Sequence, residues 1–396
     1  MMVRLDIIDP IKSMICRMKA RALGAVLLAV LCMCTCAAAQ VRVRDEIRIP
    51  DIPGYRTLKC DLHMHTVYSD GEVLPRVRVE EAWRNGLDAI SITDHIEYFI
   101  DRENVQETLD KLYRPARMLA EELGITFING TEITLDMPPG HFSAIFLKDT
   151  GALIKQDWRK AFEAAHAQGA FIFWNHPGWY GQQPDGVSRW YTEHTEIFEN
   201  GWMHGIEIVN KNTYYPNAHG WCLEKKLTMI ASSDAHEPVP MIYDEEAGES
   251  RPVTLVFATE NSPRAIEEAL RARRTVVLLD GVLIGEERFL RPIFDGSISV
   301  LNPEVSFSDA GRALVRIYND SDIDYELTAR NGTSGVSTQP ALKLAAGKTA
   351  LLTIAPGASG SSEARKIKLP FTAENLMVSP GEGLPVEIEI TVNNGL

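Results

Sequence analysis

Two histidines separated by one residue, His63 and His65, follow an apolar stretch that predicts a β-strand over residues 58–64. Because successive side chains of a strand point to opposite faces, Asp61, His63 and His65 are expected on one face. A neutral imidazole is a good ligand for a borderline divalent metal ion, and two imidazoles at this spacing can bind the same ion. The alternative is a histidine pair that packs or titrates at the surface, so the choice depends on the residues that follow.

Seven more potential metal ligands lie in the loop after this strand or at the ends of the other predicted strands. They are Asp70, His95, Glu132, His141, His176, Asp234 and His236. Six of the ten histidines of the chain thus lie at predicted strand ends. Nine ligands are too many for one ion and suit about three, and a shared carboxylate such as Glu132 would bring two ions within the separation of about 3.5–4 Å used in phosphoryl chemistry. Such a cluster lowers the pKa of bound water and holds the oxygens of a phosphate.

The segments that must position these ligands alternate between strand and helix from about residue 58 to residue 284. Strands are predicted at 58–65, 87–93, 125–132, 141–147, 170–174, 205–210, 227–231, 252–258 and 275–279, and helices at 75–85, 104–123, 157–168 and 262–273. This alternation predicts an α/β fold, a parallel barrel with its helices outside. In such a barrel, catalytic side chains come from the carboxyl ends of the strands and the loops after them, where nearly every candidate ligand lies.

The order of the motifs is similar to that of a known family. The motifs are His63-x-His65-Thr66, Ser69-Asp70-Gly71, Thr93-Asp94-His95, Gly130-Thr131-Glu132, Asn175-His176-Pro177 and Ser233-Asp234-Ala235-His236. Each motif is weak alone, but the ordered set resembles the PHP (polymerase and histidinol phosphatase) superfamily over about residues 55 to 285. The resemblance implies a distorted (β/α)7 TIM-like barrel, a trinuclear site of zinc, manganese or iron, and phosphoesterase activity.

The resemblance also implies how the ligands divide among three divalent ions. His63, His65, Glu132 and Asp234 would hold the first ion, with Glu132 bridging to the second. His141 and His176 would hold the second ion, and the third would be held by Asp70, His95 and His236. Some members of the family have a histidine in place of Asp70, and a carboxylate there is a harder ligand that favours manganese or iron over zinc.

The hypothesis for the mechanism is in-line attack on phosphorus by a hydroxide that bridges two ions, while the ions and a cation neutralise the developing charge. Arg251, before the strand at 252–258, and Lys211, after the strand at 205–210, are candidate phosphate contacts, and the alternative for each is a solvated surface cation. Asp94 is the second candidate catalytic residue beside Arg251. It is expected to orient an imidazole from behind the ligands, with proton transfer as the alternative.

The remaining histidines and a group of aromatic residues carry weaker signals. We interpret the four other histidines of this part of the chain as structural or solvated, namely His166, His194, His204 and His219. The aromatic residues Trp174, Trp179, Tyr180, Trp190 and Tyr191 either wall the pocket, where they would bind an apolar or ring-bearing leaving group, or belong to the core.

Residues 1–39 have the three parts of a secretory signal peptide. Basic residues at 17–21 precede an apolar run at 23–31, and Ala37–Ala39 offer a small-residue cleavage site. The run is much shorter than the roughly 20 residues that span a bilayer, so no transmembrane segment is expected. The protein is therefore expected to be periplasmic or secreted. A lipid anchor at a cysteine within 32–36 is the less favoured alternative.

Four of the six cysteines lie in this N-terminal segment, which leaves Cys60 and Cys222. Cys60 is expected on the outward face of the first strand, where a small buried hydrophobic residue fits well. No disulfide framework is therefore predicted for the exported protein.

The last hundred residues, 294–396, are predicted to form a module separate from the barrel at 40–290. Short strands are expected at 313–318, 324–328, 349–354 and 385–392, separated by turn-rich stretches. Their number and length suggest a β-sandwich of immunoglobulin-like size. The module contains no histidine or cysteine, so no chemistry is expected there. Docking onto the barrel, dimerisation and carbohydrate contact all remain open as its role.

The formal net charge of −14 argues against a broad nucleic-acid or anionic-lipid footprint. The favoured function is therefore an exported, metal-dependent phosphoesterase acting on a small phosphorylated substrate. A PHP-type nuclease fits less well because no basic stripe is present. An amidohydrolase also begins with His-x-His, but the Asp94-His95 and Asp234-x-His236 pairs imply a third metal ion. A surface-binding protein without activity is the alternative outside the enzymes, and the oligomeric state stays open.

Overall fold

The structure is a computed structural model, and it describes residues 43–98, 105–155, 157–244, 247–330, 335–357 and 364–393. Arg44–Leu396 form one compact unit. The signal peptide predicted at 1–39 lies outside the described residues, so export stays a prediction. Within the described ranges, none of the helices combines the length and the apolar character that a membrane span requires.

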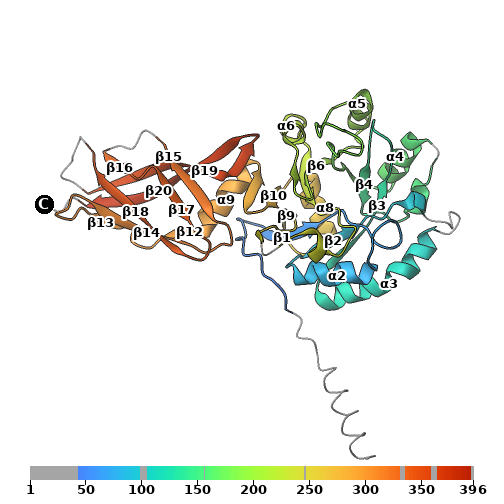
Figure 1. Cartoon of the computed structure of the whole chain (residues 1–396), viewed down its shortest axis with the longest axis horizontal. Coiled ribbons are helices and arrows are strands. Elements are labelled where there is room, and N and C mark those ends of the chain that lie inside the picture. Colours follow the sequence, from blue (N-terminus) through green and yellow to red (C-terminus); the bar gives the residue numbers. More distant parts are fainter. Residues whose placement is uncertain are drawn as a thin grey trace, which may run out of the picture. The chain divides into compact units, whose positions relative to one another are not determined.

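The N-terminal part of this unit is a distorted barrel (Figure 1). Its wall follows the order β1 (Arg56–Asp61), β2 (Ala89–Ile92), β3 (Thr126–Ile133), β4 (Phe142–Ile145), β5 (Phe171–Trp174), β6 (Gly205–Asn210) and β8 (Thr228–Ser232). The segment after β8 returns to the end of β1 through a parallel bridge between Met64 and Ala235. The barrel predicted from the sequence is therefore confirmed.

One strand of the wall, β4, runs antiparallel to both of its neighbours, whereas the alternation of elements predicted parallel strands. Only the eight residues 134–141 separate β3 from β4, and a parallel crossover needs a dozen or more. The chain therefore forms a hairpin, and β4 begins at the end of the barrel where its parallel neighbours end.

Further strands extend the sheet beyond the wall. From the other edge of β1, the sheet continues through β9 (Val253–Ala258), β10 (Thr275–Leu279) and β11 (Val282–Gly285), each antiparallel to the strand before it. The short strand β7 (Thr213–Tyr214) pairs with β6.

Helices connect and cover the strands, and Figure 1 shows α2 and α3 side by side. The helices are α2 (Pro75–Arg84), α3 (Val105–Leu123), α4 (Trp158–Ala167), α5 (Thr192–Glu199), α6 (Pro216–Lys225), α7 (Val239–Ile242), α8 (Pro263–Arg271) and α9 (Glu287–Ser297), with short 3-10 turns at Ile96–Tyr98 and Gly151–Leu153. Side chains cap two of the predicted helices. The carboxylate of Asp157 accepts a hydrogen bond from Arg159 N at the start of α4, and the hydroxyl of Ser262 accepts one from Ala265 N at the start of α8.

Apolar side chains from β1 to β5, β8 and β9 fill the barrel interior, together with side chains of α8. Cys60 and Leu62 belong to this cluster, so the prediction that Cys60 faces outward is wrong. Asp61 points away from the cluster and forms an ion pair with Arg251. Because β1 ends at Asp61, the strand alternation does not extend to His63, which explains the error. Cys60 and Cys222 are both buried free thiols.

The chain after α9 forms the predicted all-β sandwich. One sheet pairs β12 (Ile298–Val300), β14 (Ala313–Asn319), β18 (Thr349–Pro356) and β16 (Val336–Thr338), and the other pairs β13 (Glu304–Ser306), β20 (Glu382–Asn393), β19 (Arg365–Ser379), β15 (Tyr325–Ala329) and β17 (Ala341–Leu344). The sequence did not predict β19, which pairs with β11 of the barrel through Leu283 and Leu376. The two parts of the unit thus share a continuous sheet.

Candidate metal centre

The nine predicted ligands meet at the end of the barrel where the parallel strands end. Because β4 is antiparallel, His141 reaches this end from the start of its strand rather than from its end. Seven of the nine line a cavity of about 390 Å³. His63 and His65 lie beneath it and are fully buried. The lining is completed by Glu72, Tyr98, Trp179, Lys211 and Glu237.

The carboxylate of Glu132, at the end of β3, is the centre of the arrangement. Five imidazoles place a ring nitrogen within 3.5 Å of its oxygens, and they belong to His63, His65, His95, His141 and His176. Glu132 Oε1 also accepts a hydrogen bond of 2.6 Å from Asn175 Nδ2, which fixes the orientation of the carboxylate. These imidazoles come from four separate segments of the chain, so the barrel is needed to bring them together.

A second carboxylate, Asp234, approaches the two histidines at the bottom of the cavity. Its Oδ1 lies 3.3 Å from His63 Nε2 and 3.2 Å from His65 Nε2. The two Nε2 atoms are themselves only 3.0 Å apart. His63, His65 and Asp234 therefore form one compact group of potential ligand atoms, and His63, Glu132 and His176 form another.

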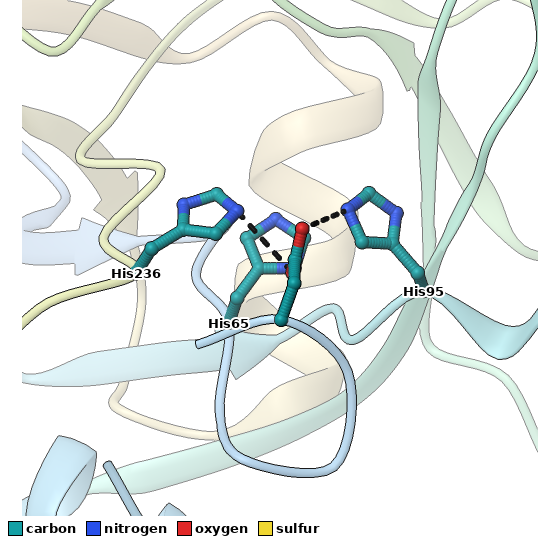
Figure 2. Close-up of side chains that lie close together, drawn as sticks. His65, His95 and His236 are labelled. Atoms are coloured by element: carbon teal, nitrogen blue, oxygen red, sulfur yellow. Dashed lines mark ion pairs between the residues drawn. The ribbon is translucent and has the colours of Figure 1, made fainter. Parts of the chain in front are cut away.

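The third group surrounds Asp70, in the loop after β1. Figure 2 shows His95 and His236 turned toward this carboxylate, with the two ion pairs, of 3.4 and 3.3 Å, drawn as dashed lines. The ring of His65 is stacked between them, with centroid separations of 4.5 Å to His95 and 4.2 Å to His236. His65, Asp70, His95 and His236 thus complete a set of three overlapping groups.

Three residues of the cavity lining have a left-handed backbone, although none is glycine. The φ angles are +27° at His176, +51° at Lys211 and +48° at Asp234. Such conformations cost on the order of 1–3 kcal/mol each and persist only where the surrounding structure enforces them, which is common at functional sites. The backbone here is therefore held in place to aim particular side chains.

Burial and charge act against each other on the ligands. Burial raises the pKa of Glu132 and of Asp234, but the nearby histidines outweigh it and hold both values well below the ordinary range. Burial lowers the pKa of His65 to about 4. Burial also lowers the pKa of His63, but the negative charges of Asp234, Glu207 and Glu132 outweigh it and together raise this pKa well above the ordinary value. Both carboxylates are therefore ionised at neutral pH, as metal ligands must be.

The donor set fits divalent metal ions. Imidazole nitrogen and carboxylate oxygen atoms together suit zinc, manganese or iron. In the described part of the chain, His141 Nδ1 is buried without a hydrogen-bond partner, and it lies 3.2 Å from Glu132 Oε1. A buried lone pair beside an ionised carboxylate is what a cation would satisfy.

A carboxylate that the sequence analysis did not single out, Glu207 on β6, supports the ligands from behind. It is fully buried, and its Oε1 lies 2.8 Å from His63 Nδ1. Its Oε2 accepts hydrogen bonds from His176 N at 2.7 Å and from Asn210 Nδ2 at 2.9 Å. An acid within the otherwise apolar stretch Gly205–Val209 was the available signal, because a buried charge needs a partner.

A buried arginine on α2, Arg78, was also missed. It is fully buried, and it donates hydrogen bonds of 2.6–2.9 Å to the backbone carbonyls of His65 and of residues 235–237. Its charge is balanced by Glu81 at 2.8 Å. Arg78 thus ties the end of β1 to the loop after β8, and each of these two segments carries ligands.

Asp94 does not contact an imidazole directly, contrary to the prediction, and it reaches His65 only through Ser69 Oγ, which lies 3.4 Å from His65 Nδ1. Its oxygens accept hydrogen bonds from Thr66 N and Oγ1 at 2.6 Å, from Ser69 Oγ at 2.7 Å and from Tyr113 Oη. These four donors occupy the carboxylate, so it shapes the loop that carries Asp70 instead. None of the described contacts joins it directly to a histidine.

Arg251 does not lie in the cavity, so its prediction as a phosphate contact is wrong. Its side chain is buried, and Nε donates to Asp61 Oδ2 at 2.7 Å, since the segment before β9 runs behind the end of β1. It lines a separate, smaller cavity with Tyr243 and Val253. Lys211, in contrast, lines the metal cavity. None of the described carboxylates forms an ion pair with it.

The four histidines interpreted as structural lie away from the cavity. His166 is exposed on α4. His194 Nδ1 accepts a hydrogen bond from Tyr191 N, His204 Nδ1 accepts one from Ile172 N, and His219 Nδ1 lies 2.8 Å from Tyr214 Oη.

Trp174, Trp190 and Trp179 take the two roles that the sequence left open, and Tyr180 takes neither. Trp174 is fully buried and stacks on His194 at 3.8 Å between centroids, and Trp190 packs edge-on against Trp174. Trp179 lines the cavity and contacts the rings of two ligand histidines. Tyr180 is 68% exposed and does not line the cavity.

Comparisons with known proteins match both parts of the chain. A family model described as the PHP domain matches residues 61–217, and one described as an Ig-like domain matches residues 298–389. A solved two-domain protein from Bacteroides vulgatus, which contains a predicted PHP-like metal-dependent phosphoesterase, is 42% identical, with a TM-score of 0.80 over 89% of this chain and 100% of that one. A protein from Bifidobacterium adolescentis assigned as a metal-dependent phosphoesterase is 16% identical over 45% of this chain and 87% of its own, with a TM-score of 0.34. A search of curated proteins found no match.

Proposed function

Because the chain belongs to the family of two-domain proteins with a PHP-like metal-dependent phosphoesterase, we propose that it hydrolyses a phosphate ester at the metal centre described above. The observation that carries the proposal is the position of Glu132, with five imidazoles around one buried carboxylate. If the role of this cluster were only structural, a few well-packed apolar residues would stabilise the fold better.

Three ions are proposed. His63, His65, Glu132 and Asp234 would hold the first, His141 and His176 together with Glu132 would hold the second, and Asp70, His95 and His236 would hold the third. Zinc, manganese and iron all suit these donors, and Asp70 favours the harder two. When bound, the ions would lower the pKa of water and neutralise charge on the phosphoryl oxygens.

Residues of the chain perform the remaining tasks. Lys211 faces the cavity from a backbone held at positive φ, and its ammonium would bind a non-bridging oxygen of the phosphate. Glu207 would keep the Nδ1 proton of His63, so that Nε2 stays free as a ligand. In the net reaction, water adds to phosphorus, the ester P–O bond breaks, and the proton passes to the leaving alcohol.

The substrate is proposed to be small and the protein to act outside the cytoplasm. A cavity of about 390 Å³ is near the lower end of the size range of small-molecule sites. The N-terminal pattern of basic, apolar and small residues supports export.

The test uses the purified full-length chain. Elemental analysis should find close to three equivalents of transition metal per chain, and phosphate release from a panel of monoesters and diesters should depend on added manganese, zinc or iron. Glu132→Gln should abolish the activity and lower the metal content. His166→Ala removes an exposed histidine on α4 and is the matched control, which should behave as the unmodified protein. Full activity of Glu132→Gln would refute the proposal.

A further inference from the structure

The mouth of the metal cavity carries an aromatic wall that the proposed hydrolysis does not require. Trp179 is 46% exposed, yet its ring lies 5.4 Å from the ring of His176 and 5.8 Å from that of His141, between centroids. Tyr98 is 52% exposed and packs at 5.0 Å on His95. Both side chains therefore border the ligands while keeping apolar surface free.

The indole of Trp179 is held in this position by the chain after it. A Cβ atom at Gly181 would come within 2.5 Å of the ring, so a side chain there would displace the indole. The ring is thus packed against its own loop and presents aromatic surface to the cavity. An indole has only two side-chain torsion angles, so it binds flat or ring-shaped groups at a small entropic cost.

Two exposed carboxylates, Glu72 and Glu237, line the same mouth. No described residue forms a salt bridge with either side chain. They are therefore free to accept hydrogen bonds from hydroxyl groups, and they repel negatively charged groups.

The net charge of the cavity lining limits the charge that the leaving group can carry. Five carboxylates and one ammonium line the cavity, so three divalent ions would leave a net charge of about +2 at neutral pH. This balances one phosphate dianion. A second anionic group on the substrate would therefore be unbalanced.

From these observations we propose that the substrate is a phosphate monoester of an uncharged, hydroxylated ring alcohol, that is, a sugar phosphate. The inference rests on the proposed function. One face of the sugar ring packs on Trp179, and its hydroxyls donate to Glu72 and Glu237. Lys211 and the metal ligands described above, when loaded with ions, would hold the phosphate.

Binding tests the inference without turnover. Calorimetry on the metal-loaded full-length chain would compare the non-hydrolysable phosphonate analogues of glucose 6-phosphate and glycerol 3-phosphate. The sugar analogue should bind at least about tenfold more tightly, because the acyclic one cannot cover the indole. The phosphonate analogue of a glucose bisphosphate should bind more weakly than the sugar analogue that carries only one phosphonate group.

Variants of single residues test which side chains cause the difference in affinity between the two analogues. Trp179→Ala should remove most of the tenfold preference and leave binding of the glycerol analogue within about twofold, and Trp179→Phe should restore part of it. Tyr180→Ala is the matched control, since Tyr180 is the adjacent exposed aromatic residue outside the cavity lining. Glu237→Gln should weaken binding of the sugar analogue only.

The outcomes separate the inference from the proposed function. Equal binding of the two analogues, or a preference that survives Trp179→Ala, overturns the inference even if phosphate esters are hydrolysed. A preference that depends on Trp179 in a chain that hydrolyses no ester supports the inference and refutes the activity.

Discussion

Replacing Glu207 by glutamine should weaken metal binding without disrupting the fold. Glutamine keeps the shape of the side chain and an oxygen that can accept from His63 Nδ1, but its NH2 group takes the place of Oε2 and cannot accept a hydrogen bond. The variant therefore removes the negative charge that strengthens the bond of 2.8 Å from His63 Nδ1, and it removes the acceptor of the bond of 2.7 Å from His176 N. Both histidines are proposed ligands, so the change acts on the metal through the orientation and basicity of their rings.

The size of the effect follows from the contacts. A charge-assisted hydrogen bond contributes about 1.5–3 kcal/mol, roughly twice a neutral one, so the loss of charge costs on the order of 1–2 kcal/mol at His63. Changes behind metal ligands typically lower metal affinity by about 10- to 100-fold, which corresponds to about 1.4–2.7 kcal/mol. Glu207→Ala should cost more stability, because it leaves three buried donors without an acceptor.

The assay is competition for zinc or manganese between the full-length chain and a chelator of known affinity, at pH 7. Glu199→Gln, which changes an exposed glutamate on α5, is the control and should leave affinity unchanged. Thermal unfolding of the metal-free proteins separates the two effects. If Glu207→Gln binds metal as tightly as the unmodified chain, Glu207 does not position His63 for a metal, and its role is only to balance charge in the core.

Three further outcomes are expected. Removing metal with a chelator should lower Tm and readdition should restore it, because ions that bind only the folded state stabilise it by mass action; an unchanged Tm would argue against occupied sites. Arg78→Lys should lower the metal stoichiometry by about one equivalent, because a lysine cannot donate hydrogen bonds to four carbonyl groups at once. The control is Arg76→Lys, which changes an exposed arginine and should leave the stoichiometry unchanged. Equal stoichiometry in the two variants would contradict the positioning role of Arg78. Burial lowers the pKa of His219 to about 4, whereas the pKa in the unfolded chain is about 6.5. As pH falls, the unfolded state therefore binds the proton first, and the folded state loses stability between about pH 6.5 and pH 4. The difference in unfolding free energy between the unmodified chain and His219→Gln, measured in urea, should therefore shrink by about 2 kcal/mol from pH 7 to pH 5, and a constant difference would exclude a neutral buried His219.

The sequence was sufficient for the class of fold and for the set of ligand candidates. Apolar strands and amphipathic helices can be recognised from the spacing of their apolar residues, which is a property of the local sequence. The histidines and acids could be found because each lies next to a strand boundary, and strand ends in a barrel converge. Thus Glu132 and the eight other candidate ligands, named from their positions alone, are the residues that the structure brings together.

Only the tertiary structure decided which partner each side chain meets. Arg251 and Lys211 could not be told apart from the sequence, because each is a cation next to a predicted strand. One neutralises Asp61 behind β1 and the other faces the cavity. Likewise, Asp94 adjoins a ligand histidine in the chain but bonds a neighbouring loop. His141 reached the site through the reversed direction of β4. The physical reason is that strand period and side-chain type are properties of a few consecutive residues, whereas pairing of charges depends on strand direction and on contacts between residues far apart in the chain.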